Sequence, residues 1–162
     1  MTLPHTSIDP IAQLMLDHDQ LLEQLASLRR ATRSLEANGF SPEVFGKVQK
    51  SLAFIEEEVS IHNRSEEEAL FPVLERYVEG PTRVMREEHK VLKTEFRKFR
   101  RAVSRLERRR MDSGAARELS DVSQSLVQLF VNHIHKENHI LFPLVQRFLT
   151  KEALREVARR MI

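Results

Sequence analysis

Two similar stretches, 71 residues apart, constrain the fold of this 162-residue chain more than any other feature. The first is HNRSEEEALFP, residues 62–72, and the second is HIHKENHILFP, residues 133–143. Each has a histidine followed four residues later by a glutamate, and each ends in Leu-Phe-Pro. The same offset maps His18 onto His89. An internal repeat of this kind predicts two equivalent helical hairpins related by an approximate twofold axis.

Helix signals run through the chain, which has only four Gly and long tracts rich in Leu, Glu, Arg and Lys. Asp9-Pro10 and Ser41-Pro42 each place an N-cap residue before a proline at the first helical position. Turn or stop signals separate the apolar segments at Asn38-Gly39, Gly80-Pro81 and Ser113-Gly114. The expected helices span residues 10–37, 42–78, 82–110 and 115–148, with a short fifth helix after Thr150. The prediction is an all-α, up-down-up-down four-helix bundle.

Apolar residues recur in each segment at alternating spacings of three and four, which is the pattern of a bundle seam. Each of the four seams contains one histidine, and the second and fourth seams also contain a glutamate. Buried carboxylates are unfavourable unless they are paired or coordinated, so these polar residues need a common purpose. In the fourth segment the expected seam continues through Leu126, Leu129, His133, Glu137, Ile140 and Leu144.

The spacing of the seam histidines brings them to one level of the bundle. His18 and His62 are 44 residues apart, and so are His89 and His133. Residues equidistant from the turn of an antiparallel hairpin lie at the same height, and both midpoints fall beside predicted turns. Each glutamate lies one helical turn, about 6 Å, beyond its histidine on the same face. We therefore expect four imidazoles and two carboxylates to converge.

Such a donor set is natural for two metal ions, each taking two histidines, with both glutamates available as bridges. The chain has no Cys, which excludes thiolate ligands. Nitrogen and oxygen ligands suit iron or manganese better than structural zinc. Helix bundles with inward Glu and His at helical spacing are also where di-iron carboxylate centres occur.

The order and spacing of these residues resemble those of the hemerythrin-like family, also called the HHE cation-binding domain, over nearly the whole chain. The resemblance implies a non-haem di-iron centre with an oxo or hydroxo bridge, in which the histidines are terminal ligands and the glutamates bridge. Substitution by manganese or zinc stays open. The matching positions are His18, His62-x-x-x-Glu66 with Leu-Phe-Pro, His89 in REEHK, and His133-x-x-x-Glu137 with Leu-Phe-Pro.

The chain departs from the oxygen-carrying hemerythrins, which have a second histidine on the third helix and an aspartate in place of the second glutamate. Here Lys93 stands four residues after His89, and Met85 stands four before it. We therefore expect two iron positions that are alike and open. They would bind or consume oxygen, peroxide or nitric oxide in stress response or sensing, with peroxidase- or catalase-like activity as one option.

Two other functions stay open at this point. One is iron handling, as a donor for the repair of iron centres, although family members with that role often carry an additional Cys-containing domain. The other is reversible oxygen binding or storage. A third alternative has no metal, with the buried His and Glu forming a structural hydrogen-bonded network.

The basic stretch from Arg97 to Arg110 has two interpretations. A nucleic-acid surface is one. We favour a solvated helix face whose last turn suits the negative end of the helix dipole, because no aromatic or turn pattern of a nucleic-acid module accompanies the charge.

Three further histidines are not assigned to the centre. His135 lies about 200° around the helix from His133 and cannot face the same core. We expect it on the surface together with His139, whose position near the Leu-Phe-Pro rim leaves a contribution open. His5 falls in an expected flexible tail, residues 1–9, before a single domain at residues 10–162. The N-terminus lacks the apolar core of a signal peptide and no apolar run spans a membrane, so we expect a cytoplasmic protein.

Overall fold

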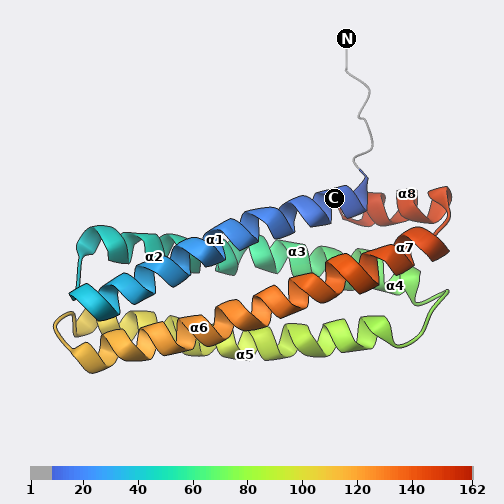
Figure 1. Ribbon diagram of the computed structural model, residues 1–162. Coiled ribbons are helices and arrows are strands. Elements are labelled where there is room, and N and C mark those ends of the chain that lie inside the picture. The colour runs from blue at the N-terminus through green and yellow to red at the C-terminus, as the bar shows by residue number, and fades with distance from the viewer. Residues whose placement is uncertain (1–8, 162) are drawn as a thin grey trace, which may run out of the picture.

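Two antiparallel helical hairpins form the bundle in the computed structural model, which describes residues 9–161 (Figure 1). The first hairpin contains α1 (Pro10–Asn38) and an arm running through α2 (Pro42–Phe54), η1 (Ile55–Val59), α3 (Ser60–Ser65), η2 (Glu66–Leu70) and α4 (Phe71–Leu74). The second contains α5 (Pro81–Arg108), α6 (Ser113–Lys136), η3 (Glu137–Leu141) and α7 (Phe142–Phe148), followed by the short α8 (Lys151–Arg160). The η segments are π-helical turns. The predicted all-α bundle with a fifth helix is confirmed, whereas His5 lies outside the described residues.

The helix starts follow the predicted capping chemistry. The Asp9 side chain accepts a hydrogen bond from the Ile11 N–H at 2.9 Å, and Ser41 accepts one from the Val44 N–H at 3.3 Å. α1 stops at Gly39, whose φ of 87° is costly for residues with a Cβ. These caps satisfy N–H groups that the helix itself leaves without partners.

Three predicted boundaries are wrong by two to four residues, and one of them is the end of α5, at Arg108 rather than residue 110. The first-hairpin arm ends at Leu74 rather than residue 78, because Arg76 and Tyr77 N–H groups bond carbonyls only three residues back. The fourth helix begins at Ser113 rather than 115. Asp112 accepts hydrogen bonds from the Gly114 and Ala115 N–H groups, so it is the N-cap.

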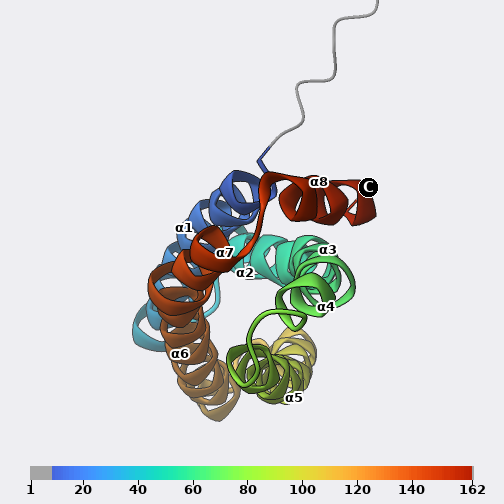
Figure 2. The ribbon, with the colours of Figure 1, turned by 90° about the vertical axis from the view of Figure 1, so that its right-hand side faces the viewer.

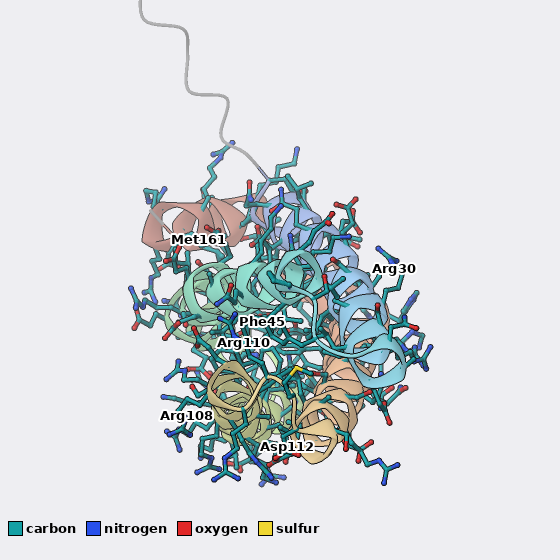
Figure 3. The ribbon with its side chains drawn as sticks, turned by 90° about the vertical axis from the view of Figure 1, so that its left-hand side faces the viewer. Arg30, Phe45, Arg108, Arg110, Asp112 and Met161 are labelled. Atoms are coloured by element: carbon teal, nitrogen blue, oxygen red, sulfur yellow. The ribbon has the colours of Figure 1, made fainter. Side chains whose placement is uncertain are left out.

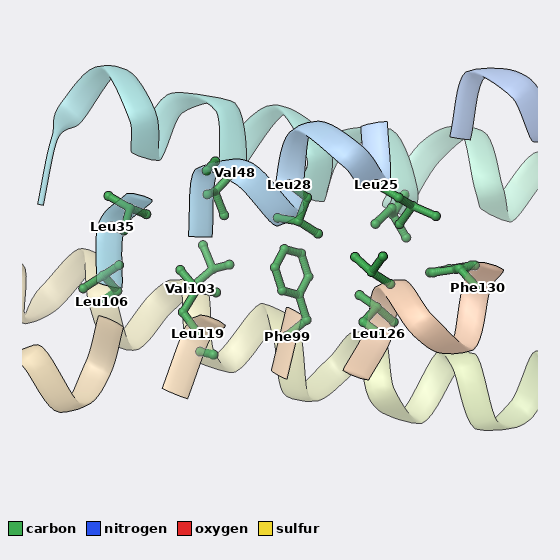
Figure 4. Packing of buried hydrophobic residues seen from close by; sticks show 14 of the residues in the cluster. Leu25, Leu28, Leu35, Val48, Phe99, Val103, Leu106, Leu119, Leu126 and Phe130 are labelled. Carbon is green, nitrogen blue, oxygen red and sulfur yellow. The ribbon is translucent and has the colours of Figure 1, made fainter. Parts of the chain in front are cut away.

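Two apolar clusters lie on either side of a polar layer. This layer consists of six buried residues: His18, His62, Glu66, His89, His133 and Glu137. The larger cluster, partly shown in Figure 4, fills the end of the bundle near the α1–α2 and α5–α6 turns, with Leu28, Phe99 and Leu119 fully buried. The smaller cluster lies toward α8 and includes Phe71 and Phe142. On α1 the two clusters end at Leu21 and Leu14, one turn on each side of His18. The polar layer is therefore enclosed by apolar residues at both ends.

The four-helix arrangement is not equally tight on all sides. α5 packs along α6, and α1 packs along both α2 and α6. The arm through α2 and α3 contacts α5 much less, and Figure 2 shows α3 and α4 facing α5 across the bundle.

The basic stretch at residues 97–110 lies on α5 and just after its end, and most of its basic side chains are exposed. Its cations pair with carboxylates, as in Arg100 with Glu56 and Arg105 with Glu118. Arg110 stacks over the Phe40 ring at 4.8 Å. Figure 3 shows Arg108 and Arg110 at the end of the bundle where the α1–α2 and α5–α6 turns lie. Within residues 9–161, no helix combines the length and apolar character needed to cross a bilayer.

Candidate metal centre

The six residues singled out by the repeat meet in the polar layer. The imidazole rings of His18 and His62 have centroids 4.8 Å apart, and so do those of His89 and His133. The Nε2 atoms of His18 and His62 are 3.1 Å apart, which places this pair level across its hairpin as predicted. All six are buried: the most exposed is His62 at 7%, while Glu66 and Glu137 are at 0%.

The two glutamates lie between the histidine pairs. Glu137 Oε1 is 3.0 Å from His18 Nε2 and 3.3 Å from His133 Nε2, so it reaches both hairpins. Glu66 Oε1 lies 2.9 Å from His62 Nε2 and 3.5 Å from His89 Nε2, which is the repeat-related arrangement. Each carboxylate is thus shared by one histidine from each pair.

Donor atoms in this layer gather into two groups, and in each group they lie within 4.8 Å of one another. One group is Glu66, His89, His133 and Glu137, and the other is His18, His62 and Glu137. Such groups are able to hold a metal ion, with Glu137 common to both.

Several buried polar atoms in the layer lack hydrogen-bond partners among the described residues. They are both carboxylate oxygens of Glu66, Oε2 of Glu137, and Nε2 of His89 and of His133. Burying such an atom without a partner costs about 1–3 kcal/mol, and more for a charged group. All five belong to residues of the layer, and carboxylate oxygens with imidazole nitrogens are a donor set for a cation. The residues present therefore fit a metal centre.

A π-helical turn starts at each glutamate. η2 begins at Glu66 and η3 begins at Glu137, and in each turn the N–H of the following Phe donates to the glutamate carbonyl five residues back. The next residue is Pro72 or Pro143, which has no N–H and would clash with the preceding turn of an α-helix. Single π turns are frequent at functional sites, and these two obey the 71-residue repeat.

The π turn corrects the predicted seam of the fourth helix. One extra residue per turn rotates everything after Glu137, so Ile140 is 56% exposed and Leu144 is only partly buried. Leu141 and Val145 occupy the core instead, at 1% and 0% exposure. The Leu-Phe-Pro phrases serve the layer as packing. The Phe71 ring stacks on His89 and the Phe142 ring stacks on His18, with centroids 5.9 and 5.4 Å apart.

Each histidine uses its outer nitrogen, Nδ1, to contact a polar partner that the sequence interpretation missed. Two of these partners precede a histidine in the sequence: Asp17 lies 2.9 Å from His62, and Glu88 lies 2.9 Å from His133. They are related by the same repeat. Such outer contacts fix which ring nitrogen faces the centre.

The other two outer partners directly follow the glutamates. Glu67 Oε1 is 2.8 Å from His89 Nδ1, and Asn138 Oδ1 is 2.7 Å from His18 Nδ1. Their positions also differ by 71 residues. A search for polar residues that repeat at this offset beside the six would have found all four partners.

Charges within the layer change the proton affinities of its histidines. Burial lowers the pKa of His133, but the adjacent Glu137 carboxylate outweighs burial and raises the pKa to about 9. At His62 and His89 burial likewise lowers the pKa, but the nearby Glu66 carboxylate outweighs burial and raises it. Burial raises the pKa of Glu137, yet its contacts with Glu66, His133 and His18 hold it well below its usual range. Metal ligands must be neutral imidazoles, so a cation entering the layer displaces protons.

Approach to the layer differs between the two histidine pairs. A groove of about 680 Å³ between the α2–α3 arm and α5 reaches His89. On the other side of the arm, the space beside His18 and His62 is about 20 Å³. The sequence predicted two alike positions, but their surroundings are unequal.

The remaining residues singled out by the sequence lie apart from the layer. His135 and His139 are exposed and pair with each other, with ring centroids 4.4 Å apart. Met85 is buried in the smaller apolar cluster, and Lys93 is exposed on the lining of the groove. Neither of the last two places a side chain among the six.

Comparisons with known proteins agree with this geometry. A family model described as the hemerythrin HHE cation binding domain matches residues 9–145. The iron-sulfur cluster repair protein YtfE of Yersinia pseudotuberculosis serotype IB (strain PB1/+) is 28% identical over 160 residues, covering 90% of this chain and 72% of the relative. The protein of the same name from Yersinia pestis (strain Pestoides F) has the same identity and coverage. With the family model matching most of its length, this chain belongs to the hemerythrin HHE cation-binding domain family.

Proposed function

We propose that the polar layer holds two iron ions and that the protein binds or consumes a small ligand there, with oxygen, peroxide and nitric oxide as the candidates. The observation that carries this proposal is the convergence of buried Glu66, Glu137, His89 and His133 atoms that lack other partners. His18 and His62 would hold one ion, and His89 and His133 the other. Both glutamates would be shared, within one domain at residues 10–162.

Bound iron supplies Lewis acidity and one-electron redox chemistry. The chain contributes the geometry and a dry environment. Asp17, Glu88, Glu67 and Asn138 orient the imidazoles through Nδ1. The Phe71 and Phe142 rings cover one face of the layer, so water is excluded from that side.

The groove is the favoured entry route for a small ligand. Its inner end is His89, its apolar lining includes Leu92 and Phe96, and its lining also carries Lys93 and Arg97. Within residues 9–161 neither of these two cations forms an ion pair. Positive charge at a cleft attracts anions and raises their association rates, so anions such as azide would enter from this side.

Stopped-flow mixing of the reduced, iron-loaded protein with oxygen tests this function. With Lys93 exposed rather than a histidine at the centre, we expect conversion to a ferric product, and we expect azide to shift the ferric spectrum. Peroxide consumption should fall in Glu66→Ala and His62→Ala. A coloured species that returns to the ferrous protein when oxygen is removed would establish reversible oxygen storage instead.

Iron donation is the second candidate. The relatives named as iron-sulfur cluster repair proteins favour it, and it uses the same layer of ligands. The test is transfer of iron from the loaded protein to a metal-free iron–sulfur protein, followed by the absorption of the rebuilt cluster. Transfer faster than release to a chelator would support donation, and transfer at the chelator rate would argue against it.

A further inference from the structure

The four outer partners of the histidines break the internal repeat at one position. Three are carboxylates, and the fourth, Asn138 beside His18, is a neutral amide. Its repeat-related residue is Glu67, which contacts His89 in the same way. The two histidines occupy equivalent places in the fold, but their outer nitrogens face different chemical groups.

This difference changes the strength of a ligand. A carboxylate that accepts the Nδ1–H makes the imidazole more basic and increases the electron density that Nε2 offers to a metal. An amide oxygen accepts the same hydrogen bond without a formal charge. Changing an outer partner of a ligating histidine typically alters metal affinity by about 10- to 100-fold. His89 is therefore a stronger ligand than His18.

The other two outer partners differ less. Asp17 accepts a second hydrogen bond from Gln13 at 3.0 Å, and Glu88 accepts one from Lys136 at 2.6 Å. The Lys136 side chain is 45% exposed, so solvent screens its charge. Both carboxylates keep one oxygen for the histidine. The contrast between the two pairs is thus concentrated at Glu67 and Asn138.

We propose that the position formed by His89 and His133 binds metal first and more tightly. The position formed by His18 and His62 fills second and releases its ion first. Glu67 and Asn138 are positioning residues that set this order. The inference rests on the proposed function, namely that the layer holds two ions.

The order has a consequence for either proposed function. A single ion, present when iron is scarce, lies beside the groove that reaches His89. The second ion, beside His18, has the weaker ligand set and is the one available for release. A partly loaded protein would therefore keep its groove-side ion.

Order of loading is best measured with Co²⁺ added to the metal-free protein without oxygen. Repulsion between two ions separates the binding steps even in equivalent sites, so affinity alone does not identify the position. Proton NMR of the histidine rings does, because paramagnetic Co²⁺ shifts the resonances of its own ligands. We expect one equivalent to shift His89 and His133, and the second to shift His18 and His62.

Two isosteric variants change the proposed cause directly. Asn138→Asp should tighten the second step about 10- to 100-fold, and Glu67→Gln should weaken the first by a similar factor, both measured by calorimetry. Glu68→Gln is the matched control, since Glu68 is the exposed neighbour of Glu67 and, within residues 9–161, forms no hydrogen bond with a histidine. It should leave both steps unchanged.

Each result separates this inference from the proposed function. Two ions that enter in the opposite order, or that shift all four histidines together, overturn the order and leave the dinuclear centre standing. So do unchanged affinities in both isosteric variants. Saturation at one ion per chain overturns the proposed function itself, and the inference with it.

Discussion

The α1–α6 side and the α2–α5 side of the bundle are related by the internal repeat, yet only the first is closed. Across the first side, Val127 and Ile134 of α6 are buried at 5% and 3% exposure. Their repeat-related residues on the open side are Glu56 and Asn63, which line the groove. Apolar residues hold one pair of helices together, whereas polar residues leave a channel between the other pair.

Helices α5 and α1, which are related by the repeat, show the same contrast. Lys93 lines the groove on α5, and the equivalent residue of α1 is Leu22, which packs against the larger apolar cluster. The extra π turn η1 also lies on the open side, whereas its counterpart in α6 is regular α-helix. A repeat can therefore keep its inner ligands alike while its interfaces diverge and set the direction of access.

The largest expected effect tests what both sides share. His133→Ala or Glu137→Ala should abolish binding of at least one ion, because each removes a buried donor of the layer. The loaded protein should also lose thermal stability, since metal stabilises the folded state that binds it. Metal analysis and thermal unfolding measure both effects.

His135→Ala is the matched control for this experiment, because His135 is an exposed histidine on the same helix. It should keep the full metal content and the unfolding temperature. If His135→Ala lost its metal while His133→Ala kept it, the proposed ligand set would be contradicted.

The shared π turns predict a smaller effect on stability. Leu70 and Leu141 are related by the repeat and are 0% and 1% exposed, so either Leu→Ala change should cost about 2–5 kcal/mol of unfolding free energy. Ile140→Ala, at a residue that is 56% exposed, should cost at most about 0.5 kcal/mol. Denaturant unfolding of the three variants decides between this register and the uninterrupted seam, in which Ile140 would be the core residue.

The open side predicts an effect on rates. Lys93→Glu should slow azide association with the ferric protein about tenfold at low ionic strength, because it reverses a charge on the groove lining. The slowing should shrink as salt is added. Lys50→Glu carries the same charge change at an exposed residue of α2 outside the groove lining and should leave the rate near that of the parent protein. Equal slowing in both variants would remove the groove from the account.

Acid–base behaviour of the metal-free protein predicts the smallest effect. The folded-state pKa of His133 is about 9, above its ordinary value of 6.5, so the folded protein binds this proton more tightly than the unfolded chain does. The stabilisation is complete below about pH 6.5 and is lost as the pH rises toward 9. The unfolding temperature should therefore fall by a few degrees across this window, and the fall should be smaller in His133→Gln, which lacks this titrating group. A rise across the same window would contradict the sign.

The sequence predicts the convergence of the six side chains because its signals are local and repeated. A histidine and a glutamate four residues apart must share a helix face, and the equal spacing of His18–His62 and His89–His133 follows from antiparallel geometry. The π turns were missed because regular helical periodicity carries Ile140, not Leu141, into the core. Pro72 and Pro143 were the available signal for a turn that departs from it.

Two other features needed the three-dimensional packing. The 71-residue offset marks Asp17 and Glu88 as a repeated pair, but their contacts cross from one helix to another, so only the packing shows which histidine each one meets. The groove depends on whether facing residues such as Glu56 and Lys93 stay hydrated or draw the two helices into contact. Only the packing of the helices shows which of the two related sides, α1–α6 or α2–α5, stays open.

Anomalous X-ray diffraction from crystals of the iron-loaded protein tests the central claim most directly. We expect two iron peaks per chain. One should lie against His18 and His62 and the other against His89 and His133, with Glu66 and Glu137 reaching both. A single peak per chain, or peaks outside these six residues, would contradict it.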